Sequence, residues 1–181
     1  MKLSTKKVAL IAALALIALL CFADEYPALR FRGDGKFSGG PVFGYRIELR
    51  KIPFYQPGEY VFHFHGMPKE EMALELYAEG KGSRDEAELR VKTVLEASIV
   101  DQTGRSICQA SGPPLEHGQN PNGWVLMLGG DEAAYWHWNC VWFRFSPRDH
   151  YTMTLRIRDI DPKTPKINLV PILKGGQPDL P

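Results

Sequence analysis

Hydrophobic and polar residues alternate along several short segments of the chain. The clearest runs from Tyr151 to Ile157, where Tyr, Met, Leu and Ile alternate with Thr and Arg. The same two-residue period occurs in residues 45–49, 60–64 and 72–77. Successive side chains of a β-strand point to opposite faces, so each segment offers one face to a core and one to solvent. The pattern therefore predicts half-buried strands.

Turn signals separate further strand candidates. The polar segment from Asp101 to Gly104 lies between two short apolar runs, which is typical of a β-hairpin. Pro171 lacks the N–H that a strand interior needs, and it suggests that the last candidate lies at a sheet edge. The further candidates are residues 97–100, 106–110, 124–128, 135–145 and 167–173.

One segment is compatible with both helix and strand. Ser83 and Glu86 have the spacing of a capping box, and apolar residues then recur at helical intervals up to Leu95. Alternate residues from Leu89 to Leu95 also fit a strand. We expect one or two helical turns that run into a strand.

Eight or nine short strands with no long helices between them predict an all-β fold. The expected architecture is a two-sheet antiparallel β-sandwich with at most one short helix. Strand number alone leaves both jelly-roll and immunoglobulin-like topologies open.

The N-terminus has the order of a secretion signal. Lys2, Lys6 and Lys7 precede an uninterrupted apolar run and then small residues. We expect residues 1–23 to be a signal peptide, residues 24–44 an irregular, Gly-rich arm, and residues 45–181 the β-sandwich domain. Cleavage before Asp24 predicts a periplasmic or secreted protein. Lipidation of Cys21, which would make a membrane-anchored lipoprotein, is the alternative.

Export changes the charge and the cysteine count. Removing three lysines and no acid leaves 19 basic against 21 acidic residues, interspersed along the chain. This balance argues against nucleic acid as a partner. Cys108 and Cys140 remain in an oxidising compartment, so we predict that they form a disulfide; two unpaired buried thiols are the alternative.

Two groups of residues are candidates for a site. His63 and His65 share one face of a strand and could bind a metal, but further ligands are needed, and we favour the interpretation that they are a solvent-facing pair. The aromatic segment 135–145 could form a core or an exposed binding surface. In the core interpretation Trp136, Trp138, Cys140 and Trp142 face inward, while Tyr135, His137, Asn139 and Phe143 face outward. The candidate binding residues are Tyr135, Trp136, His137, Trp138 and Trp142.

The sequence contains no strong catalytic motif. It has no nucleophile elbow, metalloprotease motif, phosphate-binding glycine loop or helix-loop-helix calcium site. Arg32, Gly33 and Asp34 spell an adhesion tripeptide, but Asp34 and Gly35 are also a turn signal. We therefore expect a protein that is not an enzyme and that needs no cofactor.

The aromatic run into Trp142–Phe145, the strand from Tyr151 to Ile157 and the following Asp161–Pro162 resemble a family of small exported or lipid-anchored proteobacterial proteins of unknown function. The resemblance spans residues 45–173 and implies a non-enzymatic β-sandwich, with no functional residues to transfer. The favoured function is recognition of another envelope or delivered protein, as an inhibitor or immunity factor. The alternatives are a glycan-binding module with an aromatic platform and a metal-binding protein with the His-x-His pair.

Overall fold

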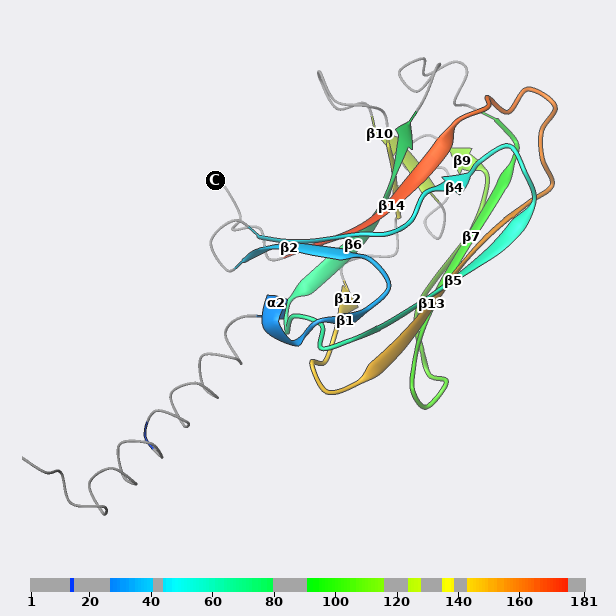
Figure 1. Cartoon of the computed structure of the whole chain (residues 1–181). Coiled ribbons are helices and arrows are strands. Elements are labelled where there is room, and N and C mark those ends of the chain that lie inside the picture. Colours follow the sequence, from blue (N-terminus) through cyan, green and yellow to red (C-terminus); the bar gives the residue numbers. More distant parts are fainter. Residues whose placement is uncertain are drawn as a thin grey trace, which may run out of the picture.

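Two mainly antiparallel β-sheets pack face to face, which confirms the prediction of an all-β sandwich (Figure 1). The computed structural model describes residues 14, 27–40, 44–79, 91–115, 124–127, 135–138 and 143–175. Its one multi-residue helix in these ranges is α2 (Pro27–Arg30). Residues 80–90, where helical turns were expected, lie outside the described residues, and the strand that follows begins at Val94.

Sheet A has the strand order β1-β5-β13-β7-β8. Its strands are β1 (Arg32–Gly33), β5 (Gly58–His65), β13 (His150–Arg158), β7 (Val94–Asp101) and β8 (Ser106–Gly112). The β7–β8 pair is the hairpin that the polar loop predicted. Strand β13 pairs over eight of its nine residues with β5 and over eight with β7, so it forms the centre of the sheet.

Sheet B has the order β2-β3-β14-β6-β11-β10-β9, with β4 beside β14 and β12 beside β6. Its strands are β2 (Lys36–Gly40), β3 (Gly44–Glu48), β14 (Asn168–Gly175), β6 (Glu71–Glu79), β11 (Tyr135–Trp138), β10 (Trp124–Met127), β9 (Pro114–Leu115), β4 (Ile52–Pro53) and β12 (Phe143–Arg144). In Figure 1, β14 and β6 cross behind β2, and β5, β7 and β13 form the opposite layer.

The core fills the space between the sheets. Phe62 and Met153 from sheet A and Leu74 and Leu173 from sheet B have no exposed surface. Full burial of such a side chain contributes roughly 1.5–3 kcal/mol to folding. A hydrogen bond also joins the layers, because Trp124 Nε1 of β10 donates to the Leu95 carbonyl of β7 at 3.0 Å.

The N-terminal segment is more regular than the sequence indicated. Residues 24–44 were predicted to be an irregular arm, but the described part forms α2, β1, β2 and the start of β3. Strand β2 pairs with β3 from Lys36 to Gly40 through its backbone. Two of the five β2 residues are glycines, so hydrophobic periodicity could not reveal this strand.

Pro171 does not mark an edge strand, because β14 lies between β6 and the pair β3 and β4. The Pro171 carbonyl accepts a hydrogen bond from Leu49 N at 2.9 Å, just past the end of β3. The N–H and C=O of a strand residue point to the same side, so the missing donor faces the gap between β3 and β4. The interruption of the partner strand is what accommodates proline in a central position.

The aromatic segment changes register along β6. Trp136 pairs with Leu76, whereas Phe143 pairs with Met72, so the register shifts by three residues between β11 and β12. An odd shift reverses which residues face the core. Trp136 is fully buried as the core interpretation predicted, but the prediction that Phe143 faces outward was wrong, since it is 6% exposed.

Candidate functional site

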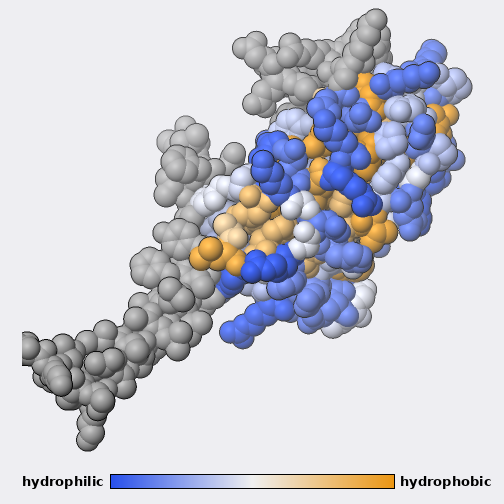
Figure 2. All heavy atoms as spheres, viewed as in Figure 1, coloured by the Kyte–Doolittle hydropathy of each residue, from blue (hydrophilic) through white to orange (hydrophobic). Residues whose placement is uncertain are grey.

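The outer face of sheet A is the best candidate for a functional surface, and we call it the sheet A face. Along each half-buried strand the outward residues alternate with core residues, and most of the outward side chains are polar. Figure 2 shows hydrophilic side chains covering much of the described surface in that view. The face consists of Glu59, Val61, His63 and His65 on β5, His150, Thr152, Thr154, Arg156 and Arg158 on β13, Glu96, Ser98 and Val100 on β7, and Gln109 and Ser111 on β8.

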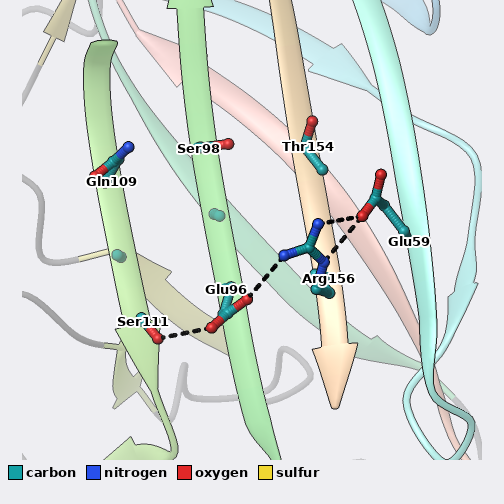
Figure 3. A pocket seen from close by; sticks show the side chains of 9 residues that line it. Glu59, Glu96, Ser98, Gln109, Ser111, Thr154 and Arg156 are labelled. Carbon is teal, nitrogen blue, oxygen red and sulfur yellow. Dashed lines mark hydrogen bonds and ion pairs between the residues drawn. The ribbon is translucent and has the colours of Figure 1, made fainter.

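An open hollow of about 740 Å³ lies over the middle of this face. Figure 3 shows its side chains in two rows across the four strands. One row contains the charged side chains, and the next contains the uncharged polar side chains of Thr154, Ser98 and Gln109. Its polar lining consists of Glu59, Glu96, Ser98, Gln109, Ser111, Thr154 and Arg156.

The charged row alternates in sign across the sheet. Arg156 Nε donates to Glu59 Oε2 at 2.9 Å, and Arg156 Nη1 lies 3.6 Å from Glu96 Oε2. Arg158 Nη2 lies 2.8 Å from Glu96 Oε1, and Ser111 Oγ donates to the same oxygen at 3.3 Å. The hydrogen bond from Arg158 lowers the pKa of Glu96, and the bond to Glu59 raises the pKa of Arg156. Both groups therefore stay charged over the physiological range.

The polar row is directly beside the charged row. Thr154 pairs with Ser98, and Ser98 pairs with Gln109 on the next strand. Thr154 and Ser98 have short hydroxyl side chains that leave the backbone floor accessible between their neighbours (Figure 3). These groups can donate and accept hydrogen bonds with a polar ligand.

Histidines gather at the other end of the sheet A face. His65 pairs with His150 across β5 and β13, and their ring centroids are 4.8 Å apart. His63 Nδ1 lies 3.2 Å from Thr152 Oγ1. Together with Arg32 of β1, these residues line a second hollow of about 280 Å³. The prediction that His63 and His65 share a face is consistent with this arrangement.

A metal site does not form around this pair in the described ranges. No group of three or more His, Cys, Asp or Glu residues there has a geometry that could hold an ion. Among the described residues, the histidine pair therefore lacks the additional ligands that the metal hypothesis requires.

The adhesion tripeptide is part of a strand pair. Asp34 N donates to the His63 carbonyl at 2.8 Å, and Asp34 Oδ2 accepts from His63 N at 2.8 Å. Asp34 and Gly35 form a bend between β1 and β2, as the turn interpretation predicted. The Asp34 carboxylate is thus engaged by the sheet.

The aromatic binding surface loses its central member. Trp136 is fully buried, and its ring lies 5.2 Å from that of Phe54, so it packs in the core and cannot present a binding surface. Its Nε1 is buried and has no hydrogen-bond partner in the part of the chain that the structure describes. The side chains of Tyr135, His137 and Trp138, and the whole of Trp142, lie outside the described residues.

Cys108 faces the core on β8 and is 5% exposed. Cys140 lies outside the described residues, so the Cys108–Cys140 disulfide stays a prediction.

Sequence reasoning missed the sheet A face as a unit. The sequence contained one indication of this face, the Thr and Arg residues of β13 that alternate with core residues and point outward. The neighbours of these residues come from β5 and β7, and only the strand order reveals them.

Comparisons with protein-family models, curated proteins and solved structures found no match for the chain. No helix in the described ranges has the length and apolar character needed to cross a bilayer. The fold and the site together define an all-β sandwich with an open polar sheet face. The resemblance to exported proteobacterial proteins stays an expectation from the sequence.

Proposed function

We propose that the chain is an exported, non-enzymatic binding protein that recognises another protein through the sheet A face. The observation that carries this proposal is the open hollow over four strands, bordered by a row of partly exposed charges. Charged and polar groups at an interface select partners through complementary charge more than they add raw affinity. An inhibitor or an immunity factor against a delivered protein is the role that we propose for such recognition.

The lining of the hollow favours a protein partner over a glycan. An aromatic platform was the basis of the glycan hypothesis, but Trp136 belongs to the core. No aromatic ring lines the 740 Å³ hollow among the described residues. Hydroxyl, amide, carboxylate and guanidinium groups remain, and they match the polar parts of a protein surface.

The two carboxylates of the hollow argue for binding over catalysis. Glu59 and Glu96 both lie beside Arg156, and hydrogen bonding to Arg158 lowers the pKa of Glu96. A general acid or base works best with a pKa near the working pH. Glu96 is shifted away from that range, which supports a non-enzymatic role.

Site-specific cross-linking tests the proposal. A photoreactive residue in place of Gln109, which lines the hollow, is expected to capture a partner protein in the cell envelope. The same residue at Ser38, an exposed position on β2 of sheet B, serves as the control. Ser98→Arg should fill the hollow and abolish the Gln109 product while leaving the circular dichroism spectrum unchanged.

Two outcomes would contradict the proposal. Equal cross-linking from Gln109 and Ser38 would show that the hollow does not select the partner. Binding of a soluble oligosaccharide that Ser98→Arg abolishes, without any protein product, would favour the glycan alternative.

Export and the disulfide are proposals of the same kind. We propose removal of residues 1–23 and pairing of Cys108 with Cys140; the burial of Cys108 on the core side of β8 supports the bridge. Mass spectrometry of the protein from its native host should give an N-terminus at Asp24. A digest without reductant should give two peptides that are joined by a disulfide between Cys108 and Cys140. An acylated Cys21 would instead establish the lipoprotein alternative.

A further inference from the structure

We propose that Arg32, His65 and His150, assisted by His63 and Thr152, form a binding site for a phosphate or sulfate group, with an affinity that rises as the pH falls. This site is separate from the 740 Å³ hollow, and it does not depend on the proposed recognition of a protein partner.

Three adjacent strands bring the basic residues together. Arg32 pairs with His65 across β1 and β5, and His65 pairs with His150 across β5 and β13. Directly paired residues lie on the same side of a sheet. All three line the 280 Å³ hollow, with Thr152 and His63 in the next row.

Arg32 is held in place by the backbone. Its Nη1 donates to the carbonyl of Leu29 at 3.1 Å and to that of Phe31 at 2.8 Å. A guanidinium has five N–H donors, so Nε and Nη2 remain available to a ligand. Arg32 has no carboxylate partner among the described residues. A fixed guanidinium with free donors is well suited to an oxyanion.

Gly33 allows this arrangement. Its φ is +130°, and a Cβ at this position would lie 2.1 Å from the His63 carbonyl oxygen. A larger residue would therefore push β1 away from β5. Only glycine permits the close approach that sets Arg32 beside His65.

The charge of the site depends on pH. Histidine side chains gain a proton between neutral and mildly acidic pH. Two protonated rings 4.8 Å apart beside Arg32 repel one another, and a bound oxyanion offsets that repulsion. Anion binding and proton uptake therefore favour each other, and the affinity rises as the pH falls.

The acidic groups near the site lie outside the lining of the hollow. The lining of the 280 Å³ hollow contains no acidic residue. Asp34, just after β1, accepts a hydrogen bond from the backbone N–H of His63. Asp149, just before β13, accepts a hydrogen bond from the Gln102 side chain, and the neighbouring Arg148 adds a positive charge. On the β7 side, Asp101 is ion-paired with Arg105, and Val100 is the outward neighbour of Thr152. The positive charge of Arg32 also disfavours the binding of a metal cation in the same hollow.

Sulfate is the sharpest probe, because it stays a dianion from pH 5.5 to 7.5 whereas phosphate titrates in this range. Sulfate is titrated into the isotopically labelled protein at constant ionic strength, and the imidazole and arginine side-chain signals are followed by NMR. We expect saturable shifts at Arg32, His65 and His150, with a dissociation constant about tenfold lower at pH 5.5 than at pH 7.5.

Matched variants define the site. Arg32→Gln and His150→Gln should each weaken sulfate binding at least about fivefold at pH 5.5. Arg144→Gln, which removes an exposed arginine on β12 of sheet B, should leave it unchanged. If one variant fails to fold by its amide spectrum, the other still decides the result.

Three results would overturn the proposal: an affinity that does not depend on pH, equal binding by the His150→Gln variant, or Zn²⁺ but not sulfate shifting the histidine signals. Vesicles then distinguish the source of the anionic group. Sedimentation at pH 5.5 with phosphatidylcholine vesicles that contain phosphatidic acid, but not with phosphatidylcholine alone, would indicate a lipid headgroup. Binding of sulfate without vesicle binding would indicate a soluble ligand.

Discussion

Strands β13 and β14 both lie in the interior of their sheets, yet their outward residues differ. On β13 the outward His150, Arg156 and Arg158 are exposed. On β14 the outward Val170 is 8% exposed and Ile172 only 1%. Sheet A thus keeps one face open to solvent, whereas the centre of the outer face of sheet B is buried.

This difference indicates where the molecule can meet a ligand. A strand with one open face alternates apolar and polar residues, and a strand buried on both faces has a continuous apolar run. The alternation in β13 and the run from Leu169 to Leu173 in β14 are these two patterns. The open face of sheet A carries both hollows and is therefore the face to test for binding.

The largest effect should come from removing an outward side chain on β14. Ile172→Ala is expected to lower the free energy of unfolding by about 2–5 kcal/mol, because it leaves a cavity. Thr154→Ala, at an outward position on β13, should cost about 1 kcal/mol or less. Urea unfolding followed by circular dichroism measures both. Similar losses for the two variants would remove the distinction between the faces.

The two faces should also differ in their ion pairs. Lys174 Nζ lies 2.9 Å from Glu75 Oε2 on sheet B, with side chains 25% and 12% exposed, whereas Arg156 and Glu59 on sheet A are 51% and 48% exposed. Lys174→Gln should cost about 1–3 kcal/mol, because it removes the ammonium group beside the half-buried Glu75 carboxylate. Arg156→Gln should cost a fraction of that, and 1 M salt should remove its effect. Unfolding at low and high salt measures the stability that each variant loses. A larger loss for Arg156→Gln than for Lys174→Gln would contradict the prediction.

The smallest effect concerns the β7–β8 hairpin, which supplies two of the five strands of sheet A. Asp101 Oδ1 accepts from Thr103 Oγ1 at 2.6 Å, Thr103 N at 2.9 Å and Arg105 N at 3.1 Å, while Oδ2 accepts from Arg105 Nε at 2.9 Å. These bonds, the Thr103 hydroxyl first, lower the pKa of Asp101 from 3.8 to about 2. Asp101→Asn keeps an acceptor oxygen but loses the charge, so a modest loss of stability is expected at pH 6.

The sign of the pH effect follows from the lowered pKa. The ionised Asp101 contributes its full stabilisation above pH 3.8 and loses it as the pH falls to about 2. The difference in unfolding midpoint between the wild type and Asp101→Asn should therefore disappear over this interval. A difference that stays constant from pH 6 to pH 2 would show that the charge is not involved.

The sequence predicted the elements better than their neighbours. Alternation located β5, β6 and β13, and the Asp101 to Gly104 loop located the β7–β8 hairpin. The alternation of apolar and polar residues did not reveal β1 and β2, because these strands pair through their backbones and have few apolar residues. The three-residue register shift between β11 and β12 also has no signature in the residue pattern, and for this reason Phe143 was assigned to the wrong face.

The candidate sites were only partly predictable. His63 and His65 share a face because they are two residues apart in one strand. Arg32 and His150 join them through strand pairing between distant parts of the chain. Periodicity describes one strand at a time, so it could not place these four residues together. It also could not show that the hollow lies between the Arg156 row and the Thr154 row.

Pro171 has a consequence for folding specificity. Its missing N–H is tolerated where β14 faces the gap between β3 and β4. A slip of β14 by two residues that set Pro171 opposite Ile47 of β3 would keep the same side chains toward the core, but the Ile47 carbonyl would lose its hydrogen bond. Proline thus excludes the alternative alignment that a run of similar apolar residues would otherwise permit, and Pro171→Ala should make strand pairing less specific before it makes the fold less stable.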